Sequence, residues 1–381
     1  MKSQLKIDVS AQESTEKIDK TGNYKLRRTR SFKKGQIQSG LPSVDCPSSR
    51  AFQTSRQIVK HPLIYDAREG DEPLNLDDVV GKVLCGDSAK TLSRLPDGFV
   101  SCAITSPPYW NLIDYGIEGQ IGKQSYEQYR DDLKKVWAEV SRCLAPNGKF
   151  VLNVPPMPIK KEVSEAFFGP SHTRYLLDLY ADLRQDILAS TDLIAYSLYI
   201  WEKQTTEKMF GSYPYPPNLY ERNYIEFIAV FVKPGKPRQV PLAVKEAAKL
   251  TQKEWLELTK QIWWMYPENV SRKEGHPAPF PEALPNRLIS MYTFPGVKEA
   301  EFPGDIVLDP FNGWGTTCVA AKRMGRRFIG IDLSPEFCHH AAIRLASTSK
   351  AIKVMKAEKP SQFDKGQQKF FMGGDEGDEK G

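Results

Sequence analysis

The chain lacks the features of a membrane, secreted or metal-stabilised protein. Its 381 residues contain no apolar run near the roughly 20 residues that a spanning helix requires, and the N-terminus has no apolar signal core. None of the six cysteines has CxxC spacing, and the five histidines show no ligand spacing. We therefore expect a soluble cytoplasmic protein with reduced core cysteines, no membrane contact and no metal.

Internal repeats are also absent, and the excess positive charge is confined to one end. Residues 1–60 hold thirteen Lys/Arg and five Asp/Glu, a net charge of +8, so the remainder is −2 against a total of +6. We expect a flexible basic arm over 1–60 and a charged, disordered tail over 349–381. The arm is either a solvated tail or a clamp on a nucleic-acid backbone.

Between these ends the chain alternates apolar runs with helical periodicity. Buried strands are expected at 79–85, 100–104, 149–154, 194–201, 224–232, 305–309 and 327–332. Amphipathic helices are expected at 126–144, stopped by residues 146–148, at 175–189, at 315–324 and from Ser334 onward. This alternation predicts an α/β fold with a doubly wound, mostly parallel sheet and helices on both faces.

Residues 234–275 interrupt this rhythm. They contain a capping pattern at 251–254 and two adjacent aromatic residues, Trp263 and Trp264. The two tryptophans are either core residues or groups that stack on a base. We expect the segment to lie outside the sheet and to serve as a small recognition region.

Three polar segments directly follow predicted strands: residues 86–87, 106–109 and 309–315. In doubly wound sheets, ligands bind at the carboxyl ends of the strands. The shared position of the three segments therefore predicts one composite active site.

The segment 309–317, DPFNGWGTT, joins a strand to a helix. Gly313 and Gly315 allow a sharp turn and close approach to a ligand, and a plain structural turn is the alternative. Asp332 follows nineteen residues after Gly313, where an acidic side chain binds ribose hydroxyls. Because GxGxxG and a phosphate-binding Lys are lacking, the pattern suits a ribose-bearing ligand without phosphate, such as S-adenosyl-L-methionine.

The tetrapeptide Ser106-Pro107-Pro108-Tyr109 predicts a stiff loop rich in hydrogen-bond acceptors. Two prolines restrict φ and remove two N–H groups, so the loop carbonyls are available as acceptors. Ser106 adds a hydroxyl and Tyr109 an aromatic face. The combination suits an NH2 group on a flat ring, although a plain loop would also account for the tetrapeptide alone.

Together these motifs resemble the β group of amino DNA methyltransferases, which methylate cytosine N4 or adenine N6. The resemblance covers about residues 82–345 and implies a Rossmann-like, circularly permuted fold, with a catalytic half at 78–233, a target-recognition region at 234–275 and a cofactor half at 276–348. It implies S-adenosyl-L-methionine binding by Asp87, His276, Pro277, Ala278, Phe280, Asp309, Phe311, Gly313, Gly315, Thr316 and Asp332. The implied catalytic residues are Ser106, Pro107, Pro108 and Tyr109.

The implied reaction is direct methyl transfer to a base flipped out of double-stranded DNA. Serine at position 106 favours cytosine N4, with adenine N6 as the alternative. C5 methylation needs a cysteine nucleophile, usually in a Pro-Cys pair, whereas this chain has Cys46-Pro47 in reverse order. An RNA or protein-glutamine methyltransferase and an inactive DNA-binding subunit are the less favoured hypotheses.

The family is typical of prokaryotic or phage restriction-modification systems, so a cognate restriction endonuclease is an expected partner. One departure from the family pattern is the repeat of Phe-Pro-Gly at 294–296 and 302–304. We expect about eight inserted residues here, forming a surface loop that borders the cofactor pocket.

Overall fold

In the computed structural model, the chain consists of two units, Met1–Arg50 and Ala51–Gly381. In the first unit, strands β1 (Lys17–Ile18) and β2 (Tyr24–Lys25) pair antiparallel. In the second unit, the structure describes residues 60–110, 119–159, 175–203, 214–216, 219–221, 223–267 and 280–349.

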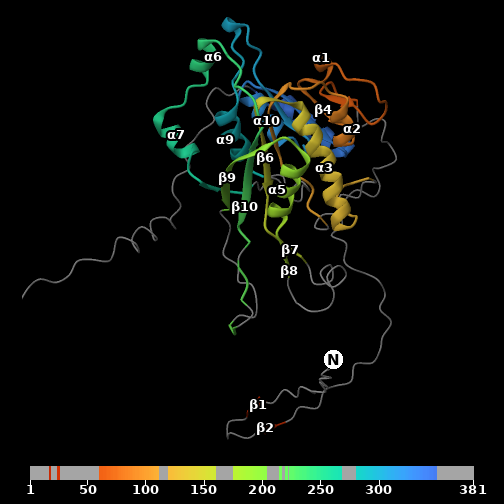
Figure 1. Ribbon diagram of the computed structural model, residues 1–381, viewed down its shortest axis with the longest axis vertical. Helices are drawn as coiled ribbons and strands as arrows, with labels where there is room; N and C mark the ends of the chain where they lie inside the picture. Colours follow the sequence, from red (N-terminus) through yellow and green to blue (C-terminus); the bar gives the residue numbers. More distant parts are fainter. Residues whose placement is uncertain are drawn as a thin grey trace, which may run out of the picture. The chain divides into compact units, whose positions relative to one another are not determined.

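A nine-stranded sheet forms the second unit, with strand order β11-β9-β10-β6-β5-β12-β13-β4-β3 (Figure 1). The strands are β3 (Ile64–Asp66), β4 (Lys82–Cys85), β5 (Val100–Thr105), β6 (Leu144–Val154), β9 (Ile194–Lys203), β10 (Ile225–Val232), β11 (Ile262–Met265), β12 (Ile306–Asp309) and β13 (Arg327–Asp332). Among these described strands, only β10 runs antiparallel to its neighbours. The predicted α/β class with a mostly parallel sheet is therefore confirmed.

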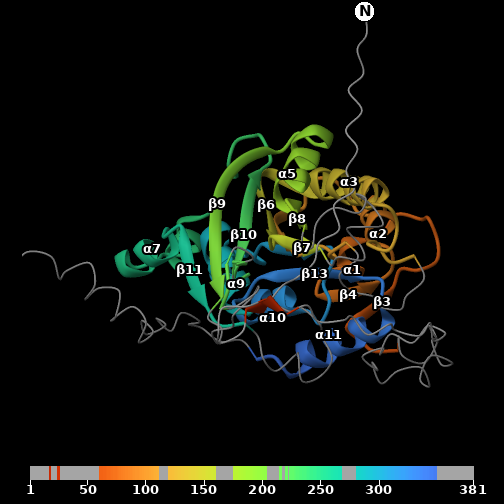
Figure 2. The ribbon, with the colours of Figure 1, turned by 90° about the horizontal axis from the view of Figure 1, so that it is seen from below.

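Helices cover both faces of the sheet (Figure 2). One face carries α1 (Leu76–Val79), α2 (Ser88–Ser93), α3 (Tyr126–Cys143) and α5 (Leu179–Ser190). The other carries α9 (Ala283–Tyr292), α10 (Thr316–Arg323) and α11 (Pro335–Ser347). No helix in the described part of the chain is long and apolar enough to cross a membrane.

Alternate strand residues supply the two cores. Ala103 and Leu308 pack on the α3 side, whereas Cys102 and Val307 pack on the α9–α11 side, and all four are fully buried. Burial on both faces explains why these strands are continuous apolar runs in the sequence. The described cysteines are free and buried, as expected: Cys85, Cys102, Cys143, Cys318 and Cys338.

The predicted strand over 79–85 is too long at its start. Val79 ends helix α1, which begins after Asn75, whose side chain accepts a hydrogen bond from the Asp77 N–H. Gly81 has a φ of 85° and turns the chain from the helix into β4 at Lys82. The helix cap at Asn75 and the turn at Gly81 therefore determine where the strand begins, although the apolar run begins earlier, at Val79.

The sequence predicts that residues 146–148 separate the α3 helix from the following strand, but in the structure they do not. Strand β6 begins at Leu144 and includes them, and its register with β5 shifts between Val100 and Cys102. Asn147 has a φ of 62° within this irregularity. A bulge therefore accommodates the turn residues inside the strand.

The helix predicted over 175–189 is shorter than expected. Tyr175–Leu177 forms β8, which pairs antiparallel with β7 (Met157–Ile159) as a separate two-stranded sheet. Helix α5 begins only after Asp178, whose side chain accepts from the Ala181 N–H. A distant pairing partner thus outweighs the helical periodicity at these residues.

The segment 234–275 is not wholly outside the sheet. It contributes α6 (Leu242–Ala247), α7 (Gln252–Leu258) with the predicted capping box, and strand β11, which pairs parallel with β9. Trp263 is a core residue, 1% exposed and stacked on Tyr199 with ring centroids 4.5 Å apart. Trp264 is 38% exposed and donates to Glu202, so the adjacent tryptophans have different environments.

Candidate active site

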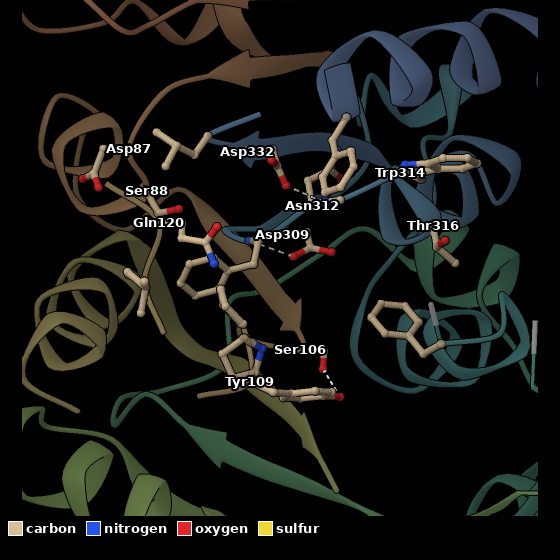
Figure 3. Close-up of a pocket in the computed structure, with 18 of the residues that line it drawn as sticks. Asp87, Ser88, Ser106, Tyr109, Gln120, Asp309, Asn312, Trp314, Thr316 and Asp332 are labelled. Atoms are coloured by element: carbon tan, nitrogen blue, oxygen red, sulfur yellow. Dashed lines mark hydrogen bonds between the residues drawn. The ribbon is translucent and has the colours of Figure 1, made fainter. Parts of the chain in front are cut away.

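A pocket lies at the edge of the sheet where β4, β5, β12 and β13 end (Figure 3). Eleven of the predicted site residues line it: Asp87, Ser106, Pro107, Pro108, Tyr109, Phe280, Asp309, Phe311, Gly313, Thr316 and Asp332. Gly315 lies behind the lining as the N-cap of α10. His276, Pro277 and Ala278 lie outside the described residues. Residues more than 200 positions apart therefore meet at one edge.

Ser106 is held by two hydrogen bonds at one end of the pocket. Its hydroxyl donates to the Asn153 carbonyl at 3.0 Å, and its Oγ lies 2.8 Å from the Tyr109 hydroxyl. Because a hydroxyl has one hydrogen, the Tyr109 hydroxyl donates in the second bond. One lone pair of Ser106 Oγ is therefore left to accept a hydrogen bond from a ligand.

The two proline carbonyls of the same loop differ. The Pro108 carbonyl accepts from the Tyr129 hydroxyl at 2.9 Å. Within the described residues, no donor reaches the Pro107 carbonyl. Of the Ser106 hydroxyl and the two proline carbonyls, Ser106 Oγ and the Pro107 oxygen are thus able to accept from a ligand.

Asp309 ends β12 and is only 1% exposed. Its two carboxylate oxygens accept from the hydroxyls of Thr105 and Thr317 at 2.8 and 2.7 Å, and Oδ1 also accepts from the Phe311 N–H. Burial raises the pKa of this carboxyl to about 6, against the opposing effect of these hydrogen bonds. Asp309 therefore ties β5, β12 and α10 together beneath the pocket.

The glycine-rich turn has the backbone conformation that its sequence predicts. Gly313 and Gly315 have φ values of 49° and 79°, which side chains rarely adopt. A Cβ at Gly315 would also lie 2.9 Å from the Ala341 Cβ. The turn thus brings Thr316, the first residue of α10, to the pocket wall.

Asp332 ends β13 on the same wall. Its Oδ2 accepts from the Gly313 N–H at 2.7 Å, and its Oδ1 accepts from the Ser334 N–H at 2.8 Å. Burial raises the pKa of Asp332 to about 7, although both hydrogen bonds oppose this. Each oxygen keeps a lone pair that is able to accept from a ligand hydroxyl.

Asp87 is the N-cap of α2 and accepts from the Lys90 N–H at 2.9 Å. The next residue, Ser88, was not among the predicted site residues, and its hydroxyl donates to the Pro310 carbonyl at 2.5 Å. This bond links the start of α2 to the DPF segment. Asp87 and Asp332 lie toward one end of the pocket, and Ser106 and Tyr109 toward the other (Figure 3).

Sequence reasoning missed several further lining residues: Ser88, Gly119, Gln120, Ile121, Asn312, Trp314, Leu333 and Phe337. Asn312 and Trp314 lie inside the DPFNGWG segment, and Trp314 stacks on His340 with centroids 4.4 Å apart. Leu333 and Phe337 flank the predicted helix start at Ser334. They are close to Asp332 in the sequence, and this closeness could have identified them as lining residues. Residues 119–121 carry no such signal.

The Phe-Pro-Gly repeat does not border the pocket, contrary to expectation. The Arg238 guanidinium lies over the rings of Phe294 and Phe302, at 5.9 and 5.4 Å from their centroids. Arg238 forms an ion pair with the buried Asp305. Asp305 precedes β12 at its amino end, so the repeat lies at the edge of the sheet opposite the pocket.

Comparison with known proteins agrees with this geometry. The sequence profile of the N6_N4_Mtase family, described as DNA methylase, matches residues 100–343. The chain is 31% identical over 289 residues to the Type II methyltransferase M.MthZI of Methanothermobacter thermautotrophicus, covering 68% of this chain and 75% of the relative.

Solved structures with the same fold include TTHA0409 of Thermus thermophilus, complexed with S-adenosyl-L-methionine. That structure has a TM-score of 0.55 and 31% identity, covering 69% of this chain and 92% of its own. PvuII DNA methyltransferase (cytosine-N4-specific) has a TM-score of 0.52 and 17% identity, covering 81% of this chain and 97% of its own. At that identity the second likeness concerns the fold alone.

Proposed function

We propose that this chain, which belongs to the N6_N4_Mtase family of DNA methylases, transfers a methyl group from S-adenosyl-L-methionine to N4 of cytosine in a short duplex DNA site. Membership of the family rests on the match over residues 100–343 and on the relative that is 31% identical.

The observation that carries the proposal is the pair of acceptors in the Ser-Pro-Pro-Tyr loop. Ser106 Oγ has its proton committed to the Asn153 carbonyl, and the Pro107 carbonyl has no donor within the described residues. An exocyclic NH2 group has two hydrogens to donate, one to each acceptor. Two acceptors on a stiff loop therefore suit an aromatic amine better than a hydroxyl or a carbonyl.

These two hydrogen bonds orient the amine for direct transfer. Held at both hydrogens, the nitrogen turns its lone pair out of conjugation with the ring and toward the methyl donor. The Tyr109 ring provides a face for the base, and positioning accounts for most of the rate enhancement. No side chain of this loop forms a covalent intermediate. S-adenosyl-L-methionine would supply the electrophilic methyl group when it is bound. The methylated nitrogen becomes neutral by losing one of its two hydrogens as a proton to solvent.

The opposite end of the pocket fits this cofactor. The two oxygens of Asp332 are able to accept from ribose hydroxyls, and Leu333 and Phe337 provide apolar surface for an adenine ring. Asp87 lies at the same end, near the expected position of the adenine. The turn containing Gly313 lets the backbone approach the methionine portion closely.

The order of the motifs along the chain supports a permuted member of the β group. Ser106 follows β5 early in the chain, and Asp309 ends β12 about 200 residues later, yet β5 and β12 are neighbours in the sheet. The catalytic half at 78–233 thus precedes the cofactor half at 276–348. Because the target amine lies within a base stack in duplex DNA, the proposal includes base flipping.

Cytosine N4 is preferred to adenine N6 because position 106 is serine, which is associated with N4 members of the family. Both bases present the same donor pair to Ser106 and Pro107, so the acceptor geometry suits either amine. Adenine N6 is the second candidate.

The decisive experiment is mass spectrometry of nucleosides from DNA methylated by the purified protein. We expect N4-methylcytosine from the wild type, at least about a hundredfold less from Ser106→Ala, and wild-type levels from the control Ser93→Ala at the exposed end of α2. N6-methyladenine alone would refute the cytosine assignment. Unchanged transfer by Ser106→Ala would refute the role of the loop.

The Type II relatives suggest that a cognate restriction endonuclease acts on the same site. Target recognition is assigned to residues 234–275 and backbone binding to the basic residues 1–60. Deletion of residues 1–55 is expected to weaken DNA binding and to reduce its salt dependence. A truncated protein with unchanged affinity and salt dependence would exclude the clamp.

A further inference from the structure

The parallel ladder between β5 and β6 ends beside Ser106. Its last paired residues are Thr105 and Leu152. One position further on, the carbonyl of Asn153 faces β5, because it accepts the Ser106 hydroxyl at 3.0 Å. A side-chain hydrogen bond from Ser106 therefore takes the place of backbone pairing at this position.

Extending the register by one rung identifies why the pairing stops. In a parallel ladder the Asn153 carbonyl would accept from the N–H of residue 107, and the carbonyl of residue 107 would accept from the N–H of residue 155. Both residues are proline, which has no N–H. Ser106 substitutes for the first missing donor, but nothing in the described part of the chain substitutes for the second.

The Pro107 carbonyl is left without a donor from the described residues. Pro107 and Pro155 are both buried. A buried carbonyl without a hydrogen bond is rare in folded proteins. Pro107 lines the pocket, so a ligand bound there is placed to supply the missing donor.

We propose that Pro155 is a positioning residue that, by lacking an N–H, keeps the Pro107 carbonyl unpaired for the target amine. This inference rests on the proposed methyl transfer and extends it to a residue on the neighbouring strand. Pro155 does not line the pocket and acts only through Pro107.

The test introduces the missing donor. Pro155→Ala provides an N–H directed at the Pro107 carbonyl, whereas the control Pro156→Ala provides one at the next position, which alternation of the strand directs away from β5. We expect kcat for methyl transfer to fall about tenfold in Pro155→Ala, corresponding to competition from one hydrogen bond. KM for DNA, cofactor affinity and Tm are expected to match those of Pro156→Ala.

A rescue variant separates the N–H from the loss of the proline ring. Placing lactic acid at position 155 replaces the amide of the Pro155→Ala variant with an ester, which keeps the methyl side chain but has no N–H. We expect this ester variant to recover most of the wild-type kcat. Wild-type kcat in Pro155→Ala, or an equal loss in the ester variant, would overturn the proposal.

Infrared spectroscopy provides a readout that does not require activity. An isotope label on the Pro107 carbonyl is expected to absorb at lower frequency in Pro155→Ala than in the wild type, because the new N–H bonds to it. An unchanged frequency would overturn the inference even if the wild type methylated DNA. A shifted frequency in a protein whose wild type transfers no methyl group would instead refute the proposed function.

Discussion

The hydroxyl oxygens of Ser106 and Tyr109 lie 2.8 Å apart, and Ser106 is the acceptor of that hydrogen bond because its own hydrogen goes to the Asn153 carbonyl. Tyr109 thus contributes a donor to Ser106 as well as a ring to the pocket. Tyr109→Phe is expected to lower kcat about three- to tenfold, the value of one hydrogen bond. Tyr109→Ala removes the ring as well and is expected to lower kcat further. Steady-state methylation assays compare the two. A wild-type kcat in Tyr109→Phe would exclude a role for the hydroxyl, and equal losses in the two variants would exclude a separate role for the ring.

The raised pKa of Asp332 predicts that cofactor binding depends on pH. Protonation removes an acceptor for the ribose hydroxyls, so affinity for S-adenosyl-L-methionine is expected to fall roughly three- to tenfold from pH 8 to 6, across the pKa of about 7. Titration calorimetry measures the effect, and Asp332→Asn is the control that binds weakly at both pH values. A pH-independent affinity in the wild type would contradict the role of this carboxylate.

The stability of the cofactor-free protein should respond to Asp332 in the opposite sense. Its pKa is higher in the folded chain than in the unfolded chain, so its contribution to the free energy of unfolding is fully present below about pH 4 and is lost as pH rises through 7. Urea denaturation of the wild type and Asp332→Asn at several pH values isolates this contribution. The two proteins should diverge in stability over that window.

Gly315 is needed both for its φ of 79° and for its contact with α11. Gly315→Ala places a methyl group 2.9 Å from the Ala341 Cβ, and we expect a loss of about 2–3 kcal/mol in the free energy of unfolding. Gly81→Ala is a matched control, since Gly81 has a φ of 85° but no neighbour within 4 Å. It should lose only about 1 kcal/mol. Equal losses would show that contact with α11 contributes nothing.

Glu226 links the sheet beside the pocket. Its Oε1 lies 2.6 Å from Lys203 Nζ, and its Oε2 accepts from Asn153 Nδ2 at 2.5 Å. Glu226→Gln leaves a largely buried ammonium without its counter-ion, and we expect a loss of about 2–3 kcal/mol. Adding Lys203→Met is expected to recover most of it, as measured by chemical denaturation. A double variant as unstable as the single one would argue against the ion pair as the cause.

The sequence alone predicted the features that depend on residues adjacent in the chain. The buried strand runs indicated a mostly parallel sheet, and the DPFNGWG turn required glycine at positions 313 and 315, which the structure confirms. Placement of Ser106, Asp309 and Asp332 at one edge also followed, because parallel strands end together. Their roles in catalysis and cofactor binding remain predictions.

Other features depended on contacts between distant residues. Tyr175–Leu177 became a strand through its pairing with β7, and β11 joined the sheet through its pairing with β9. Periodicity reports the burial of a residue but not its partner, so neither pairing was available from the sequence.

In the Ser-Pro-Pro-Tyr loop, some features follow from the sequence and others from the tertiary structure. Its sequence determined a stiff loop with two potential acceptors, because proline restricts φ and lacks an N–H. Only the tertiary structure decided that Asn153 takes the Ser106 proton and that Tyr129 donates to the Pro108 carbonyl. It also set the β5–β6 register, which, continued past Thr105 and Leu152, directs position 155 at the Pro107 carbonyl. Hydrogen-bond partners are set by the register of neighbouring strands and by packing, which a single segment does not encode.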